Sequence, residues 1–122
     1  MNPKRIYIVD DDPSMIKLYD RSLRPQLEID GVEVRTFFGA DVALEAIDRD
    51  GSMPDLLLTD DRMPVMTGRE LAATLRKRGY AGKILMVSGT AEEDVRASGV
   101  DELLGKPIDL PTLRNRVRAL LA

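Results

Sequence analysis

The sequence predicts a single α/β domain of the doubly wound class, with five strand–helix pairs around a mostly parallel sheet. Short apolar runs alternate with amphipathic helical patterns five times over 122 residues, which is typical of a parallel sheet with helices on both faces. Hydrophobic residues make up 43% of the chain and charged residues 32%, enough for one core beneath a charged surface. Because no repeat or linker interrupts the pattern, we expect one domain over residues 1–122.

The first strand and the first helix are predicted from the residues near the amino terminus. Residues 6–9 form a short apolar run followed by acids, as is typical of a buried strand. Asp12 suits the N-cap of a helix, and Pro13 suits its first position, where a backbone N–H has no helical partner. The inner face of this helix is expected to carry Met15, Leu18, Tyr19 and Leu23.

Two more strands and a second helix follow. Residues 32–37 are rich in β-branched and aromatic side chains, which favours a strand. Residues 40–49 have helical periodicity, and residues 56–59 are apolar enough for a strand that is covered on both faces. The inward side chains of the second helix are expected to be Val42, Ala43, Ala46 and Ile47.

The last third of the chain repeats the alternation. Residues 67–70 and 90–93 both match capping boxes, so each predicts the start of a helix. Residues 84–87 and 103–104 are the apolar runs that predict the fourth and fifth strands. The final helix carries a stripe of period 3.6 that consists of Leu110, Leu113, Val117, Leu120 and Leu121.

Carboxylates, a hydroxyl and an amine come directly after the predicted strands. Ligand sites of doubly wound folds lie beyond the carboxyl ends of the strands, so these groups are expected at one rim. The set comprises Asp10, Asp11, Asp12, Asp60, Asp61, Ser88 and Lys106. Taken singly, Asp12 is explained as an N-cap, Ser88 as a partner for a strand-end carbonyl and Lys106 as a surface lysine. Their joint occurrence favours a functional site.

The chemistry of this set indicates a divalent cation and an incoming phosphoryl group. Crowded carboxylates repel one another unless a cation relieves the charge. With oxygen ligands alone, Mg²⁺ is the natural occupant and Mn²⁺ is the alternative. A lysine and a serine can stabilise an incoming anion, and an aspartate can act as a nucleophile toward phosphorus.

Residue types that are missing narrow the function classes. The chain has no cysteine and no histidine, which excludes disulfides, thiolate chemistry and histidine-based catalysis within the chain. A phosphohistidine, if one takes part, must belong to another protein.

The net charge of -3 and the pI of about 5.0 argue against a nucleic-acid backbone as the main partner. The sequence shows neither a signal peptide nor a membrane-spanning stretch, so a cytoplasmic protein is expected.

These residues, in this order, resemble the receiver domain of bacterial response regulators. The resemblance covers almost the whole chain and is carried by residues 8–13, 54–60, 63–64, 66–68, 86–89, 99–102 and 106–107. It implies a flavodoxin-like sheet with strand order 2-1-3-4-5, as in chemotaxis regulators. It also implies a switch in a two-component phosphorelay, which takes a phosphoryl group from the phosphohistidine of a sensor kinase.

The resemblance implies a role for each residue that matches the family pattern. Asp60 matches the phospho-acceptor. Asp10 and Asp11 match the acidic pair that holds Mg²⁺, with Asp11 as the more direct ligand. Asp60 itself and the backbone carbonyl of Arg62 complete the implied protein ligands.

The fourth and fifth strand ends complete the implied site and also depart from the family. Ser88 matches the hydroxyl that turns toward the phosphoryl group, Lys106 matches the lysine that contacts it, and the peptide before Pro107 is expected to be cis. Leu103 stands where the family usually has an aromatic ring, and Ile108 replaces a common phenylalanine. We therefore expect the switch to act through Ser88 and the fourth helix, or through backbone shifts alone.

Other positions carry hypotheses of their own. Arg62 departs from the smaller or polar residue that is frequent there, and its guanidinium is expected over the pocket mouth, where it would slow the entry of hydrolytic water. Asp61 is expected to face solvent or the helix side. The fourth helix, with Val95 almost its only large apolar residue, is expected to be a mobile element. Arg114 and Arg118 mark a candidate dimer surface on the fourth and fifth helices.

The implied partners are a sensor histidine kinase or phosphotransfer protein and a downstream effector protein or domain, without direct contact to nucleic acid or membrane. The chain would be no enzyme beyond its own phosphorylation and dephosphorylation, and it would act alone, as a phosphorylation-dependent homodimer, or as a piece of a longer regulator. One alternative is a haloacid-dehalogenase-type phosphatase, because Asp10-x-Asp12, Ser88 and Lys106 follow that motif order. Against it, the chain has no room for a cap domain. The other alternative is a pseudo-receiver that binds a partner without phosphorylation.

Overall fold

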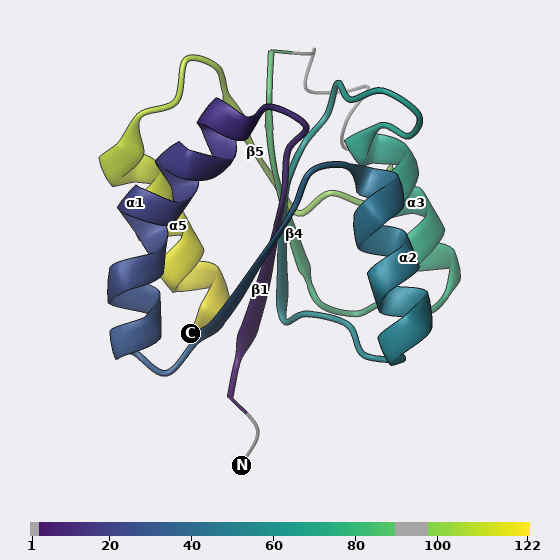
Figure 1. The fold of residues 1–122 in the computed structure, drawn as a ribbon, viewed down its shortest axis with the longest axis horizontal. Coiled ribbons are helices and arrows are strands. Elements are labelled where there is room, and N and C mark those ends of the chain that lie inside the picture. The colour runs from purple at the N-terminus through teal and green to yellow at the C-terminus, as the bar shows by residue number, and fades with distance from the viewer. Residues whose placement is uncertain (1–2, 90–97) are drawn as a thin grey trace.

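A computed structural model describes residues 3–89 and 98–122 as a three-layer α/β sandwich (Figure 1). All strand pairings are parallel, and the order across the sheet is β2-β1-β3-β4-β5, which confirms the expected fold. The strands are β1 (Arg5–Val9), β2 (Glu33–Phe37), β3 (Leu56–Asp60), β4 (Lys83–Ser88) and β5 (Glu102–Gly105). The described helices are α1 (Pro13–Ile29), α2 (Ala40–Asp50), α3 (Gly68–Lys77) and α5 (Leu110–Leu121).

The core consists of two hydrophobic clusters, one on each face of the sheet. Helices α1 and α5 cover one face, and α2 and α3 cover the other (Figure 1). Alternate residues of β1 enter different clusters, since Ile6 and Ile8 pack under α1 and α5 while Tyr7 and Val9 pack under α2 and α3. Because both faces are covered, β3 and β4 are apolar through their centres, at Leu56–Leu58 and Ile84–Val87, and their polar residues stand at the strand ends.

The predicted helix starts are confirmed by their caps. Asp12 accepts a hydrogen bond from the backbone N–H of Ser14 at 2.9 Å, with Pro13 in the first turn of α1. At α3 the capping box is complete, because Thr67 and Glu70 each accept from the other's backbone N–H. The capping box predicted over residues 90–93, and the mobility expected around Val95, lie outside the described residues.

One expectation about inward side chains is wrong, at Val42 of α2, and the expectation for α1 is met at Tyr19 and Leu23 and in part at Met15, which packs against the core. Val42 is 46% exposed, because the buried stripe of α2 is Ala40, Ala43, Ala46 and Ile47, and Val42 falls on the flank of that stripe. In α1 the buried positions are Ile16, Tyr19, Leu23 and Leu27, so Met15 and Leu18 lie at the margin of the stripe. A shift of one residue turns a helix position by about 100°, which short apolar patterns do not resolve.

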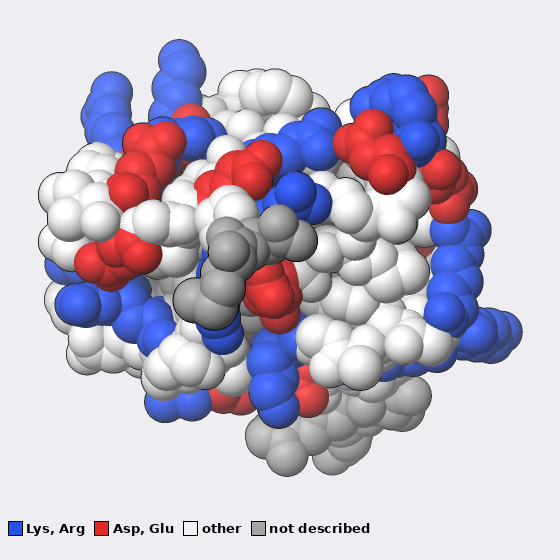
Figure 2. Space-filling model, turned by 90° about the horizontal axis from the view of Figure 1, so that it is seen from below, with Lys and Arg blue, Asp and Glu red and all other residues white. Residues whose placement is uncertain are grey.

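The amino and carboxyl ends of the strands lie at opposite edges of the molecule. The amino ends of the strands point toward the lower side of Figure 1, and on that face basic and acidic side chains are interspersed (Figure 2). The carboxyl ends lie at the opposite rim, where β1 leads into α1 and β3 leads into α3. No helix among the described residues is long and apolar enough to cross a membrane.

Candidate functional site

The rim at the carboxyl ends of the strands brings together the residues that sequence reasoning selected. Val9 pairs with Thr59 in the sheet register, so Asp10 and Asp60 follow directly on neighbouring strands. The backbone N–H of Asp10 donates to Phe37 at 3.1 Å, which extends the ladder beyond β1. On the other side of β3, the backbone N–H of Lys106 donates to the carbonyl of Ser88 at 3.2 Å.

Three carboxylates form an acidic cluster at this rim. Asp10, Asp11 and Asp60 each offer one oxygen, and these oxygens lie within 4.8 Å of one another. Asp10 and Asp60 are buried, whereas Asp11 is exposed. Asp10 Oδ1 accepts from the backbone N–H of Asp12 at 2.9 Å, but Asp10 Oδ2 is buried without a hydrogen-bond partner. A buried carboxylate oxygen without a donor suits a cation, so these residues fit a divalent metal with oxygen ligands.

Burial and neighbouring charges shift the pKa of Asp10. The pKa of Asp10 is raised from 3.8 to about 6, mainly by burial and also by the charges of Asp60 and Asp11. The backbone N–H of Asp12 and the charge of Lys106 oppose that shift. The charged form of Asp10 is therefore disfavoured by its surroundings, and a bound cation would favour it.

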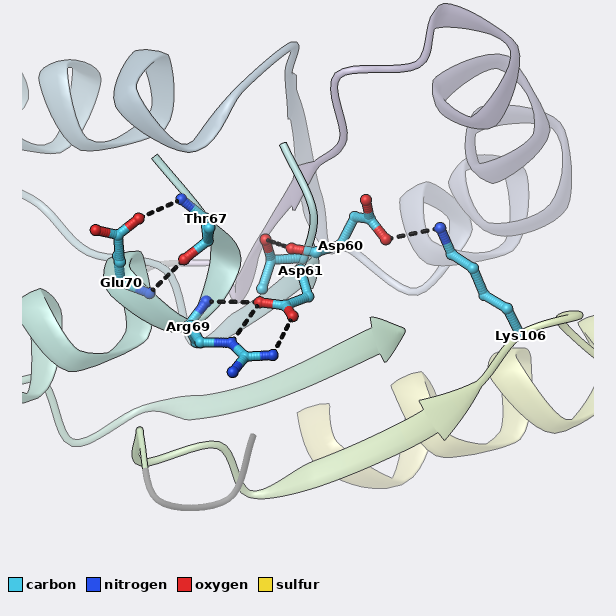
Figure 3. Close-up of polar contacts among 7 residues, drawn as sticks. Asp60, Asp61, Thr67, Arg69, Glu70 and Lys106 are labelled. Carbon is cyan, nitrogen blue, oxygen red and sulfur yellow. Dashed lines mark hydrogen bonds and ion pairs between the residues drawn. The ribbon is translucent and has the colours of Figure 1, made fainter. Parts of the chain in front are cut away.

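Lys106 supplies the positive charge nearest to Asp60. Its Nζ lies 2.8 Å from Asp60 Oδ1, where the Lys106 side chain is 40% exposed and the Asp60 side chain is 6% exposed (Figure 3). Partial burial of the ammonium opposes its charged form, but the hydrogen bond and the charge of Asp60 outweigh that effect and raise the pKa of Lys106. The peptide between Lys106 and Pro107 is cis, as the resemblance implied.

An open cavity of about 310 Å³ lies over this pair. It is lined by Asp60, Arg62, Ser88, Gly89 and Lys106. Arg62 is exposed, and Ser88 is buried at the end of β4. An anion that entered this cavity would meet a carboxylate, an ammonium, a guanidinium and a hydroxyl within one small volume.

Asp61 does not face solvent, which corrects one of the two expectations for it. Its side chain points away from Asp60 toward α3 (Figure 3) and is 2% exposed. Asp61 Oδ2 lies 2.6 Å from a terminal nitrogen of Arg69, and Asp61 Oδ1 accepts from the backbone N–H and the Nε of Arg69 at 3.3 and 3.1 Å. Successive side chains of a strand point to opposite faces, so Asp61 points to the face covered by α2 and α3. A buried carboxylate there requires a partner, and Arg69 provides it. Sequence reasoning missed Arg69, since no spacing rule marks it.

The amino end of α3 contacts the backbone of the acceptor strand. The Gly68 N–H donates to the carbonyl of Asp61 at 2.8 Å, and a Cβ at Gly68 would lie 2.0 Å from the Asp60 carbonyl oxygen. Only glycine permits this approach. Together with the Asp61–Arg69 pair, the contact closes the loop that carries Arg62.

Two of the departures from the family pattern, Leu103 and Ile108, pack against different hydrophobic clusters. Leu103 is partly buried and packs against the cluster under α2 and α3, while it pairs with Met86 in the sheet register. Ile108 is partly buried against the cluster under α1 and α5. Neither residue brings an aromatic ring to the rim.

Comparison with known proteins identifies the family. The family model of the response regulator receiver domain matches residues 6–118, so the chain belongs to the response regulator receiver domain family. Because the chain belongs to this family, the hypothesis of a haloacid-dehalogenase-type phosphatase is set aside. The hypothesis of a pseudo-receiver that binds a partner without phosphorylation is still to be tested. The relatives are response regulators, which are signalling proteins.

Two curated relatives give the scale of the similarity. The chain is 36% identical to the phosphate regulon transcriptional regulatory protein PhoB of Rhizobium meliloti over 127 residues, which cover 99% of this chain and 53% of PhoB. It is 36% identical to the response regulator MprA of Mycobacterium leprae over 121 residues, which cover 96% of this chain and 50% of MprA. The chain thus spans about half the length of the curated relatives that it matches.

Solved structures share the fold over nearly the whole chain. A CheY-like receiver domain protein of Methanospirillum hungatei superposes with a TM-score of 0.81 at 29% identity, covering 98% of this chain and 94% of that one. The response regulator TrrA of Thermotoga maritima, solved in complex with Mg(2+)-BeF, superposes with a TM-score of 0.78 at 28% identity, covering 97% and 99% of the two chains.

Proposed function

We propose that this protein is a phospho-accepting switch that receives a phosphoryl group on Asp60. The observation that carries the proposal is the pairing of Asp60 with Lys106 at 2.8 Å, beside a three-carboxylate cluster that contains a buried oxygen without a donor. The acceptor, a cation site and a counter-charge for the incoming anion thus lie around one cavity. Residues 1–122 would act as one receiver domain.

The cation site is proposed to hold Mg²⁺, with Mn²⁺ as an alternative. Asp10, Asp11, Asp60 and the backbone carbonyl of Arg62 would provide its protein ligands, and Asp10 Oδ2 is the oxygen with the greatest need of a cation. When bound, the cation would neutralise charge on the carboxylates and on the phosphoryl oxygens. Its binding would also remove the repulsion that raises the pKa of Asp10.

The proposed transfer takes the phosphoryl group from a phosphohistidine of a sensor histidine kinase or phosphotransfer protein. A carboxylate oxygen of Asp60 forms the new P–O bond while the P–N bond breaks, and the electron pair stays on the imidazole nitrogen, which then takes a proton. The negative charge of Asp60 moves onto the phosphoryl oxygens. Lys106 can follow it, and the hydroxyl of Ser88 lines the same cavity and can donate to those oxygens.

The output would be a change in contacts with a downstream effector protein or domain in the cytoplasm. With Leu103 packed in the core, the report of phosphorylation would act through Ser88, the fourth helix or the backbone, and no ring would turn. Arg114 and Arg118 line a groove between α1 and α5, whereas Arg116 pairs with Glu102 of β5. Arg114 and Arg118 are both exposed, and a phosphorylation-dependent homodimer through the fourth and fifth helices would use them at its surface.

The test is phosphorylation by a small donor. Wild-type protein, Asp60→Asn and the control Asp30→Asn, an exposed acid at the end of α1, would be incubated with acetyl phosphate and Mg²⁺ and read by intact mass. We expect one phosphoryl group on the wild type and on the control, none on Asp60→Asn, and none in EDTA. Addition that survives Asp60→Asn would show that another aspartate is the acceptor. No addition from either acetyl phosphate or a phosphohistidine donor would favour a pseudo-receiver.

A further inference from the structure

Tyr19 carries a polar atom that the proposed function does not use. Its side chain is 1% exposed and belongs to the apolar cluster between the sheet and helices α1 and α5. Among the described residues, two buried side-chain atoms lack a hydrogen-bond partner, and they are Asp10 Oδ2 and the hydroxyl of Tyr19. Leaving such a group unpaired costs about 1–3 kcal/mol, so its presence requires an explanation.

Both unpaired atoms lie on the same side of the sheet. By strand alternation, Asp10 and Asp60 continue the rows of Ile8 and Leu58, which face α1 and α5. Tyr19 packs against that same face. Because α1 begins at the rim and helical side chains lean toward the amino end, the phenol of Tyr19 leans toward the acidic cluster.

The electrostatics agree with this placement. Burial is the main cause that raises the pKa of the Tyr19 phenol, and the charges of Asp10 and Asp60 raise it further. The hydroxyl therefore lies within electrostatic reach of both carboxylates and stays protonated, so it can donate a hydrogen bond. Among the described residues, the buried acceptor that lacks a donor is Oδ2 of Asp10.

We propose that Tyr19 is a positioning residue for the cation site, whose hydroxyl donates to the Asp10 carboxylate through one buried water. This inference rests on the proposed function, because it assumes that Asp10 binds a divalent cation. A phenylalanine would fill the same space without burying a polar atom. The hydroxyl of Tyr19 is therefore explained if it orients the Asp10 carboxylate. Outer hydrogen-bond partners of this kind commonly change metal affinity by about 10–100-fold.

The test compares two tyrosine-to-phenylalanine variants of the same chain. Mg²⁺ alone would be titrated by calorimetry into wild type, Tyr19→Phe and Tyr7→Phe, and thermal unfolding in EDTA would be measured for each. Tyr7 is the matched control, since it is equally buried but lies under α2 and α3, and its hydroxyl contacts Arg35. We expect Tyr19→Phe to bind Mg²⁺ about 10-fold more weakly while its metal-free stability is unchanged or higher. Tyr7→Phe should bind Mg²⁺ as the wild type does.

The outcomes separate this inference from the proposed function. Equal Mg²⁺ affinity of wild type and Tyr19→Phe would overturn the role of Tyr19 and leave the cation site standing. Equal losses of affinity and stability in both variants would indicate a general packing effect, which also overturns it. A wild type that does not bind Mg²⁺ would overturn the proposed cation site together with the inference.

Discussion

Asp60 is a nearly buried carboxylate that is neutralised from one side only. Lys106 reaches it from the end of β5 with its ammonium still partly in solvent, so the pair is neither a rigid buried bridge nor a free surface contact. A fully buried pair would resist separation, and a fully exposed one would contribute little. This partial burial of the ion pair suits a lysine that must move its contact from the Asp60 carboxylate to a phosphoryl group.

Arg62 is the residue through which the lifetime of an aspartyl phosphate can be tested. Its exposed side chain lines the cavity beside Asp60 and Lys106, where a guanidinium can pair with phosphoryl oxygens and obstruct water. We expect Arg62→Ala to shorten the half-life of the phosphorylated protein several-fold. The measurement is the decay of the phosphorylated intact mass after removal of acetyl phosphate, with the exposed Arg49→Ala as control. A half-life equal to that of the wild type would contradict the hypothesis.

The loop between β3 and α3 is the element that holds the site in place. It is closed by the pair of Asp61 and Arg69, by the contact of Gly68 with the acceptor backbone, and by the capping box of α3. Val65 within the loop has a φ of 70°, which a β-branched residue rarely adopts, and its side chain is 87% exposed. The loop thus keeps an unfavourable backbone conformation while both of its ends are tied to the fold. The Arg62 carbonyl, a proposed metal ligand, depends on this arrangement.

The energetic weight of the closure can be measured with a double-mutant cycle. Asp61 is almost fully buried, so Arg69→Gln removes a principal partner of a carboxylate that solvent cannot reach. We expect a loss of about 2 kcal/mol in the free energy of unfolding, and Asp61→Asn in the same chain should recover part of it. Urea unfolding of the two single variants and the double variant gives the coupling energy. The exposed pair Arg49–Asp50 is the control, with coupling near zero expected, and a similarly small value for Asp61–Arg69 would contradict the assigned role.

The buried carboxylate of Asp10 makes the stability of the whole molecule depend on pH. The pKa of Asp10 is raised from 3.8 to about 6, so the folded protein binds a proton there that the unfolded chain has already released. Stability from this group is therefore complete below pH about 4 and is lost as the pH rises toward about 6. Lowered pKa values, such as those of Glu70 and Asp109, act in the opposite direction.

Comparison with Asp10→Asn isolates this contribution. In EDTA, we expect the variant to be more stable than the wild type at pH about 7 and to lose this advantage at pH about 4.5. Urea unfolding at the two pH values gives the difference. Addition of Mg²⁺ at pH about 7 should stabilise the wild type and not the variant, because a bound cation replaces the proton. Parallel pH profiles of wild type and variant in EDTA would show that Asp10 is not the group responsible.

Local patterns and one topological rule were enough to predict most of the fold and the residues of the candidate site. Apolar runs of strand length and the caps at Asp12 and Thr67 located the elements, because these signals depend on neighbours within one turn or one strand. The rule that parallel strands present ligands at their carboxyl ends then placed Asp10, Asp60 and Lys106 at one rim. These inferences needed no knowledge of contacts between distant segments.

The tertiary structure alone decided how the polar groups are paired. Asp61 is buried against Arg69, Tyr19 keeps an unpaired hydroxyl beneath the acidic cluster, and the partly buried Leu103 packs against the core. Val42 lies outside the buried stripe of α2 by a rotation that periodicity did not resolve. The physical reason is the same in each case. Burial and partner choice depend on side chains that meet only when helices pack on the sheet, whereas periodicity and capping are set by residues adjacent in the chain.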